Sequence, residues 1–200
     1  VGKDLLRWKY QRYVKEYCRT IRSVDEQVGR LLDYLEEKGV LDNTVIVYTS
    51  DQGFLLGEHG LYDKRFMYEE SFRTPLIISC PSLVKKHSVC KELVQNIDLA
   101  PTFLSLAGVE VPKEMSGRSL LPLFKNGKAE NWRNELYYHF YDYPAVGSVR
   151  KHDGIRTKRY KLIHWHGEGS GNDEAIDFWE LYDLKKDVME VNNVYDNPKY

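Results

Sequence analysis

Residues 45–53 read VIVYTSDQG, six largely apolar or β-branched residues followed by a carboxylate, an amide and a glycine. A short apolar run bounded by polar residues is typical of a strand that is buried on both faces. In open α/β sheets, ligands bind beyond the carboxyl ends of the strands, which is where Asp51 and Gln52 stand. The stretch therefore predicts a strand of an α/β sheet with functional groups directly after it. An ordinary turn at the end of a strand is the alternative that Asp51, Gln52 and Gly53 leave open.

The residues before this strand predict a long helix. Apolar side chains recur there at alternating spacings of three and four, which is one stripe of a helix: Val14, Tyr17, Ile21, Val24, Val28, Leu31 and Leu35. Gly39 is the expected end of the helix. Because a strand follows directly, the pattern favours a helix that packs on a sheet over a coiled coil.

The residues after the strand continue the α/β pattern. Residues 76–79 (LIIS) predict a second buried strand, and residues 98–107 predict a short helix with Pro101 in its first turn and Gly108 at its end. Residues 51–75 between the two strands are polar and contain glycines. A loop of this length inside a compact domain is usually functional or disordered, and its composition favours function.

Aromatic strands and turns replace this pattern after about residue 125. Strands are expected at residues 136–143, 154–156, 160–164 and 179–184, in a small antiparallel sheet. We therefore predict an α/β fold with residues 1–125 in the main sheet domain and residues 126–200 in a smaller α+β subdomain.

The composition excludes several classes of protein. Twenty-nine basic and 30 acidic side chains leave a net charge of -1, so no global field favours nucleic acid or an anionic membrane. No apolar run approaches the roughly 20 residues that span a bilayer. Neither a nucleic-acid partner nor a membrane span is expected. Cys18, Cys80 and Cys90 lack the spacing of a zinc site, and a bridge between Cys80 and Cys90 stays open.

The loop after the strand combines oxygen ligands with cations. Asp51 and Gln52 supply a carboxylate and an amide oxygen, which suit calcium or magnesium. Lys64 and Arg65 suit an anionic substrate, and His59 has the intrinsic pKa for proton transfer near neutral pH. A solvated charged loop without a function is the alternative.

Ordered motifs along the chain resemble the type I sulfatases of the alkaline-phosphatase superfamily. They begin with YTSDQG at residues 48–53 and continue as follows: GEHG at 57–60, Lys64 with YE at 68–69, RTP at 73–75, DLAPT at 98–102, GRSL at 117–120, GIRT at 154–157, YKLI at 160–163 and ELYDL at 180–184. This resemblance implies that residues 1–125 are the C-terminal portion of an alkaline-phosphatase-like sheet domain. It also implies a sulfuric ester hydrolase that uses calcium and a formylglycine nucleophile.

The resemblance also implies roles for individual residues. Asp51 and Gln52 would bind the metal, with Gln52 in place of the Asn or His of many relatives. Lys64 would bridge the sulfate and the nucleophile, and His59 would lie at the sulfate as the acid for the leaving group.

Two parts of the family's site do not occur in the sequence. The Cys/Ser-x-Pro-x-Arg motif that is converted to formylglycine is absent, and so are the paired aspartates that complete the metal site. We therefore expect the N-terminal half of the enzyme to lie outside this chain, and the 200 residues alone to be inactive. The resemblance implies a periplasmic or extracellular location.

The substrate implied by the resemblance is a sulfated carbohydrate, with N-acetylglucosamine 6-sulfate as the first choice. Asp63, Arg65 and His152 would contact sugar hydroxyls, although an aromatic core with exposed histidines is the alternative for the C-terminal part. His164 and His166 share one face of a strand, where a surface pair is favoured over a metal pair. Two rival functions stay open, a phosphate mono- or diester hydrolase of the same superfamily and a non-catalytic binding module.

Overall fold

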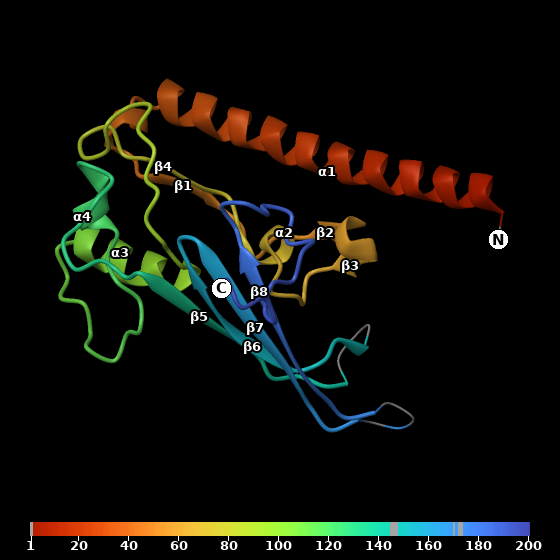
Figure 1. Ribbon diagram of the computed structural model, residues 1–200. Helices are drawn as coiled ribbons and strands as arrows, with labels where there is room; N and C mark the ends of the chain where they lie inside the picture. The colour runs from red at the N-terminus through yellow and green to blue at the C-terminus, as the bar shows by residue number, and fades with distance from the viewer. Residues whose placement is uncertain (1, 145–147, 170, 172–173) are drawn as a thin grey trace. The chain divides into compact units, whose positions relative to one another are not determined.

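The computed structural model describes residues 2–144, 148–169, 171 and 174–200 (Figure 1). The chain divides into two compact units. One contains the residues up to Val47 together with Ile78–Ser82, and the other contains Tyr48–Ile77 together with Leu83–Tyr200. The division at residue 125 that the composition suggested is a different partition and stays a prediction.

The first unit contains the long helix α1 (Lys3–Glu37), which confirms the helix predicted from the apolar stripe. The helix ends where Gly39 adopts a φ of 66°, with its N–H donating to the carbonyl of Glu36. The 3-10 helix η1 (Leu41–Asn43) follows. No residue of α1 is fully buried, so the expected packing of the stripe on a sheet is not seen among the described residues.

The two predicted strands are β1 (Ile46–Thr49) and β4 (Leu76–Ser79), and they pair in a two-stranded sheet. Their expected burial on both faces was wrong. None of their residues is fully buried, and Ile77 is 64% exposed. Burial requires neighbours, and within the described part of the chain each strand has only one hydrogen-bonded partner.

The loop between these strands contains short elements rather than unstructured chain. They are β2 (Leu55–Leu56), η2 (Glu58–Gly60), β3 (Tyr62–Asp63) and α2 (Glu69–Phe72). Strands β2 and β3 pair antiparallel, and the side chains of Leu55 and Met67 are completely buried. The loop is therefore anchored by buried side chains, with Met67 in the same core as residues of the C-terminal strands, and this gives its polar side chains defined positions.

A second helical segment follows β4, with η3 (Asn96–Asp98), α3 (Leu99–Leu106) and α4 (Leu121–Phe124). Pro101 lies in the first turn of α3 and Gly108 after its end, as predicted. Asp98 is completely buried, accepts the N–H groups of Gln95 and Arg118, and pairs with the guanidinium of Arg133. The cysteines are free, so Cys80 and Cys90 are not bridged.

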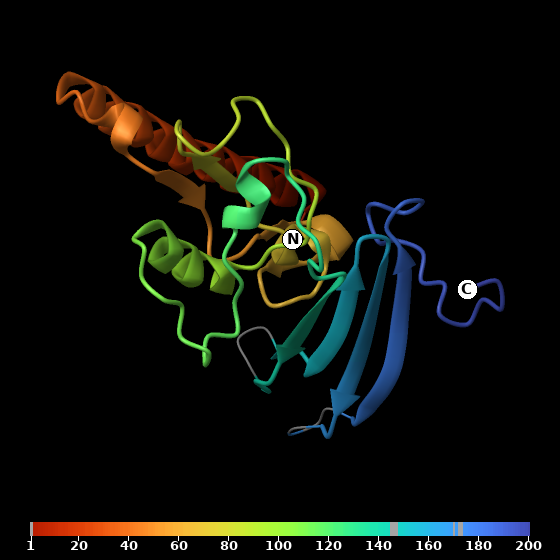
Figure 2. The same cartoon turned by 90° about the vertical axis from the view of Figure 1, so that its left-hand side faces the viewer.

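The C-terminal part forms the predicted antiparallel sheet, with four strands in sequence order (Figure 2). The strands are β5 (Glu135–Phe140), β6 (His152–Thr157), β7 (Tyr160–Gly167) and β8 (Ile176–Asp183). Lys161, Ile163 and Trp165 of β7 point to the core, which also contains Met67 and Tyr182. Among the described helices, none has both the length and the hydrophobicity needed to cross a membrane.

Candidate active site

Asp51 and Gln52 follow β1 directly, in a turn that side-chain hydrogen bonds hold. The amide of Asn96 donates to the carbonyls of Ser50 at 3.1 Å and Asp51 at 2.8 Å, and the hydroxyl of Ser50 donates to the carbonyl of Gln52. Asp51 is exposed and Gln52 is partly buried. The Nε2 atom of Gln52 is buried and has no hydrogen-bond partner among the described residues. This NH2 group is therefore free to donate a hydrogen bond to a ligand.

This donor set fits part of a calcium or magnesium site. A carboxylate and an amide oxygen are ligands that these hard cations prefer. Calcium takes six to eight oxygens, however, and two side chains supply only a few of them. Asp51 and Gln52 can hold one side of such an ion, and other groups must complete its coordination.

Backbone contacts connect this turn to α2. The N–H of Gly53 donates to the carbonyl of Ser71 at 2.8 Å, and the N–H of Phe54 donates to the carbonyl of Glu70 at 2.7 Å. A Cβ atom on Gly53 would lie 2.0 Å from the carbonyl oxygen of Glu70, so only glycine fits there. The position of the turn that carries Asp51 and Gln52 is therefore set by α2.

His59 also lies against this segment. Its φ of 54° places it in the left-handed region, and its side chain is 15% exposed. The ring stacks on Tyr68 with the centroids 4.3 Å apart, and Nε2 lies 3.5 Å from a carboxylate oxygen of Glu70. These two neighbours fix the orientation of an imidazole that can hold an anion or transfer a proton.

Lys64 is the third predicted site residue that contacts α2. Its carbonyl accepts a hydrogen bond of 2.7 Å from the hydroxyl of Ser71, while its ammonium group has no ion-pair partner in the described chain. The flanking residues Asp63 and Arg65 pair with each other and keep 33% and 26% of their side chains exposed. The structure thus anchors His59, Lys64 and the residue after Gln52 on one short helix and leaves a cation free for an anionic ligand.

A buried ion-pair network holds α2 on the C-terminal sheet. The ammonium of Lys161 is completely buried, lies 2.6 Å from Glu190 and 3.0 Å from Glu69, and donates to the carbonyl of Met67. Glu69 is the first residue of α2, and its N–H donates to the carboxylate of Glu190 at 2.6 Å. Burial raises the pKa of the Glu190 carboxyl. Burial acts the same way on Glu69, but the ion pairs with Lys161 and Arg156 outweigh it and lower the pKa of that carboxyl.

The sequence interpretation missed Lys161 and Glu190 as positioning residues. A signal for Lys161 was present, because strand alternation places it on the same face as Ile163 and Trp165. A lysine on an apolar face needs a buried acidic partner. No local pattern marks Glu190, which lies beyond the last strand.

His152 lies inside the aromatic core of the C-terminal sheet. The residue is completely buried, and its ring stacks on Trp165 with the centroids 4.3 Å apart. Nδ1 lies 2.8 Å from the carbonyl of Arg150, whereas Nε2 has no hydrogen-bond partner among the described residues. The proposed contact between His152 and a sugar stays a prediction.

Burial of His152 predicts a loss of stability in acid. Desolvation lowers the pKa of this imidazole from 6.5 to about 4 in the folded protein. The unfolded chain binds the proton more tightly, so stability is fully present above about pH 6.5 and falls as the pH drops towards 4. A shift of this size corresponds to at most about 3 kcal/mol. His152→Gln should flatten the profile from urea unfolding, whereas His87→Gln, at an exposed position, should leave it unchanged.

The fold defines a class of protein, the sulfatases with an alkaline-phosphatase-like fold. Residues 3–109 match the Sulfatase family model, and residues 57–200 match the model of the C-terminal part of N-sulphoglucosamine sulphohydrolase. The chain belongs to the sulfatase family. This confirms the family and the fold class that the sequence motifs predicted.

Two relatives match all or most of the chain. An N-acetylglucosamine-6-O-sulfatase of Bacteroides thetaiotaomicron is 53% identical over 100% of this chain and 35% of its own length. A multifunctional alkaline phosphatase superfamily protein of Trinickia caryophylli is 35% identical over 92% of this chain and 36% of its own.

One solved structure matches 100% of this chain, and the match covers 40% of the solved chain. It is described as a complex with its substrate D-glucosamine-2-N,6-O-disulfate. Its TM-score is 0.92 at 53% identity. The chain thus spans little more than a third of the length of the curated relatives it matches.

Proposed function

We propose that the protein to which this chain belongs removes the 6-sulfate of a sulfated hexosamine, with N-acetylglucosamine 6-sulfate as its substrate. The observation that carries this proposal is the attachment of His59, Lys64 and Gly53, the residue after Gln52, to one helix, α2. The name of the relative that is 53% identical supports the choice of sugar and of ring position.

Each of these residues has a distinct task in this proposal. Asp51 and Gln52 would hold calcium, or magnesium as the alternative, which would supply positive charge to polarise the sulfate. Lys64 places a positive charge on a sulfate oxygen, where it stabilises the charge of the transition state. His59 donates a proton to the leaving alkoxide, for which an imidazole has a suitable intrinsic pKa.

The nucleophile and the remaining metal ligands belong, in this proposal, to an N-terminal part of the same enzyme. Two side chains cannot fill the coordination sphere of calcium. The relatives are almost three times as long as this chain, and the apolar stripe of α1 lacks buried residues. A formylglycine in that part would supply the nucleophile. The 200 residues alone would then be inactive, and a periplasmic or extracellular location remains part of the proposal.

Asp63 and Arg65 are the proposed contacts of the sugar ring. Their mutual ion pair holds a carboxylate and a guanidinium in place while both side chains remain partly exposed. An acceptor beside a fork of donors suits vicinal hydroxyl groups. His152 is the third proposed contact, because its Nε2 has no hydrogen-bond partner among the described residues.

Initial rates of the full-length enzyme on a panel of esters test the proposed function. We expect N-acetylglucosamine 6-sulfate to give the highest kcat/KM, ahead of N-acetylgalactosamine 6-sulfate, a simple aryl sulfate and an aryl phosphate. Faster hydrolysis of the phosphate ester would favour the rival phosphatase function, which the relative from Trinickia caryophylli supports. No turnover of any ester by the calcium-loaded enzyme would favour a binding module.

Replacing Arg65 separates sugar recognition from sulfate chemistry. Arg65→Ala should lower kcat/KM for the sulfated sugar by roughly 10- to 100-fold, since a hydrogen bond from a charged group contributes about 1.5–3 kcal/mol. Turnover of the aryl sulfate, which has no sugar hydroxyls, should stay within about twofold. Arg22→Ala removes a more exposed ion pair, with Glu26, and serves as the control. Equal losses on both substrates would contradict the assigned role.

A further inference from the structure

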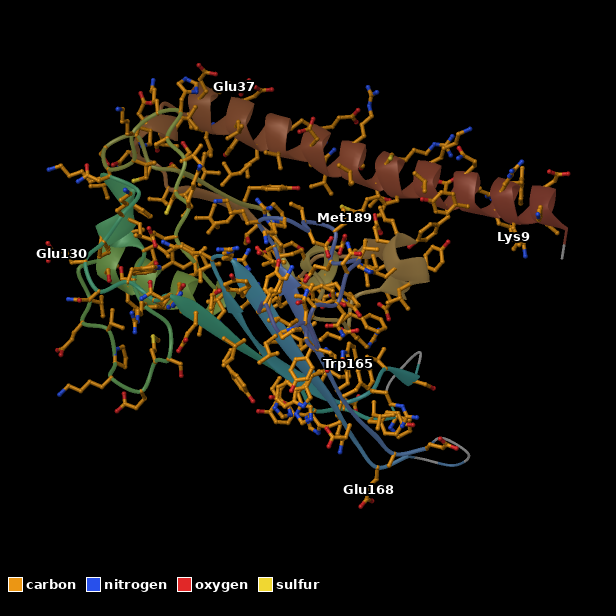
Figure 3. The ribbon with its side chains drawn as sticks, in the orientation of Figure 1. Lys9, Glu37, Glu130, Trp165, Glu168 and Met189 are labelled. Atoms are coloured by element: carbon orange, nitrogen blue, oxygen red, sulfur yellow. The ribbon has the colours of Figure 1, made fainter. Side chains whose placement is uncertain are left out.

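Two histidines and two aspartates gather on the face of the four-stranded sheet that points away from its core. His164 and His166 lie two residues apart on β7, so both point to this face. The strand register places Asp153 of β6 opposite His164, and Asp177 of β8 opposite His166. The four side chains therefore meet across three neighbouring strands, on the half of the sheet near the labelled Trp165 and Glu168 (Figure 3).

The nitrogens of both histidines converge on one carboxylate. Nε2 of His166 lies 2.8 Å from Oδ1 of Asp153, and Nδ1 of His164 lies 3.9 Å from the same oxygen. One ligand atom from each of the three residues lies within 4.8 Å of the others. Nε2 of His166 is itself buried and makes no hydrogen bond among the described residues. The three side chains are 24–30% exposed, so an ion can reach them.

Asp177 and Trp179 hold His164 in place from the other side. Nε2 of His164 is 2.8 Å from a carboxylate oxygen of Asp177, and its ring stacks on Trp179 at 4.0 Å and 5°. With the proton on Nε2, the lone pair of Nδ1 points towards Asp153. A carboxylate that fixes the tautomer of a metal-binding histidine in this way is a recurrent feature of zinc sites.

We propose that Asp153, His164 and His166 bind a divalent ion of the zinc class, with Asp177 as the carboxylate that positions His164. Two imidazoles and one carboxylate suit zinc and its transition-metal neighbours, whereas calcium and magnesium prefer oxygen ligands. Three protein ligands leave one tetrahedral position for water. The ion would connect β6 to β7, and through Asp177 to β8, at a place separate from the oxygen ligands Asp51 and Gln52.

Small side-chain movements complete the geometry. Zinc takes nitrogen and oxygen ligands at about 2.0–2.2 Å, so tetrahedral ligand atoms lie about 3.4 Å apart. The contact between His166 and Asp153 is already shorter than this, and the contact between His164 and Asp153 is slightly longer. The ion would replace the direct contact between His166 and Asp153 and shorten the distance between His164 and Asp153, without a change in strand register.

Zinc titration of the calcium-loaded, tag-free full-length protein against a chromophoric zinc chelator tests the site without any measurement of activity. His166→Ala and Asp153→Asn should each lose one equivalent of bound zinc or weaken it by more than about 100-fold. Asp177→Asn should weaken it by about 10- to 100-fold, the effect typical of groups that orient a metal ligand. His139→Ala, on the neighbouring strand and outside the ligand set, should bind zinc as the wild type does.

Cobalt substitution gives a second readout, a visible absorption spectrum that residues with a merely structural role would not produce. Visible absorption of a tetrahedral cobalt complex should appear with the wild type and with His139→Ala, and disappear with His166→Gln, which retains the size of the side chain. Equal zinc binding by the wild type and His166→Gln would overturn the proposed site. The contact between His166 and Asp153 would then be an ordinary surface ion pair. Displacement of zinc by millimolar calcium would overturn the choice of ion.

Discussion

Lys64→Ala should abolish sulfate release by the full-length enzyme. The backbone of Lys64 is held by Ser71 of α2, and its ammonium group has no ion-pair partner in the described chain. The charge of Lys64 is therefore available to the substrate. Removing a single donor that stabilises transition-state charge typically lowers kcat by about 10²–10³. Because Lys64 contributes a full charge, we expect a loss at the upper end of this range or beyond it, with little change in KM.

Initial rates on the sulfated sugar and on an aryl sulfate measure this loss, and both substrates should be affected equally. Lys64→Arg retains the charge with a different geometry and should recover part of the activity. Lys113→Ala removes an exposed lysine elsewhere and is the matched control. Thermal unfolding should be unchanged in all three variants, since the Lys64 side chain has no ion pair to lose. Near-normal turnover by Lys64→Ala would refute the site assignment.

Lys161→Met should destabilise the fold by about 3–5 kcal/mol, the usual cost of removing one partner from a buried ion pair. The substitution leaves Glu190 completely buried and Glu69 without its closest cation. It also removes the hydrogen bond to the carbonyl of Met67, next to α2. Activity should fall as well, because α2 positions Gln52, His59 and Lys64.

Urea unfolding monitored by fluorescence measures the change. Lys158→Met is the matched control, since Lys158 also pairs with a glutamate at 2.6 Å but is half exposed. Surface pairs of this kind contribute at most about 1 kcal/mol. The double variant Lys161→Met/Glu190→Leu should regain much of the lost stability, because it removes the buried charge that the single variant leaves unpaired. Similar losses for Lys161→Met and Lys158→Met would show that the network is not a buried anchor.

Periodicity and local chemistry were sufficient for the longer helices and strands, but not for the short elements of the loop between β1 and β4. The stripe of α1, the bounds of β4 and the four C-terminal strands follow from spacings that the chain carries within each segment. The loop after β1 was identified by its residue types alone. The burial of β1 was predicted wrongly, because burial depends on how many strands lie beside it and not on its own sequence.

The pairing of distant side chains came only from the tertiary structure. Lys161 meets Glu69 and Glu190 across separations that no local pattern spans, and alternation could mark only the face of Lys161. His164 and His166 were placed on one face by alternation, but Asp153 joins them through the register of β6 with β7. Register is set by the turns and by the packing of the whole sheet. The sequence therefore determined which groups are available for chemistry, and the fold decided which of them meet.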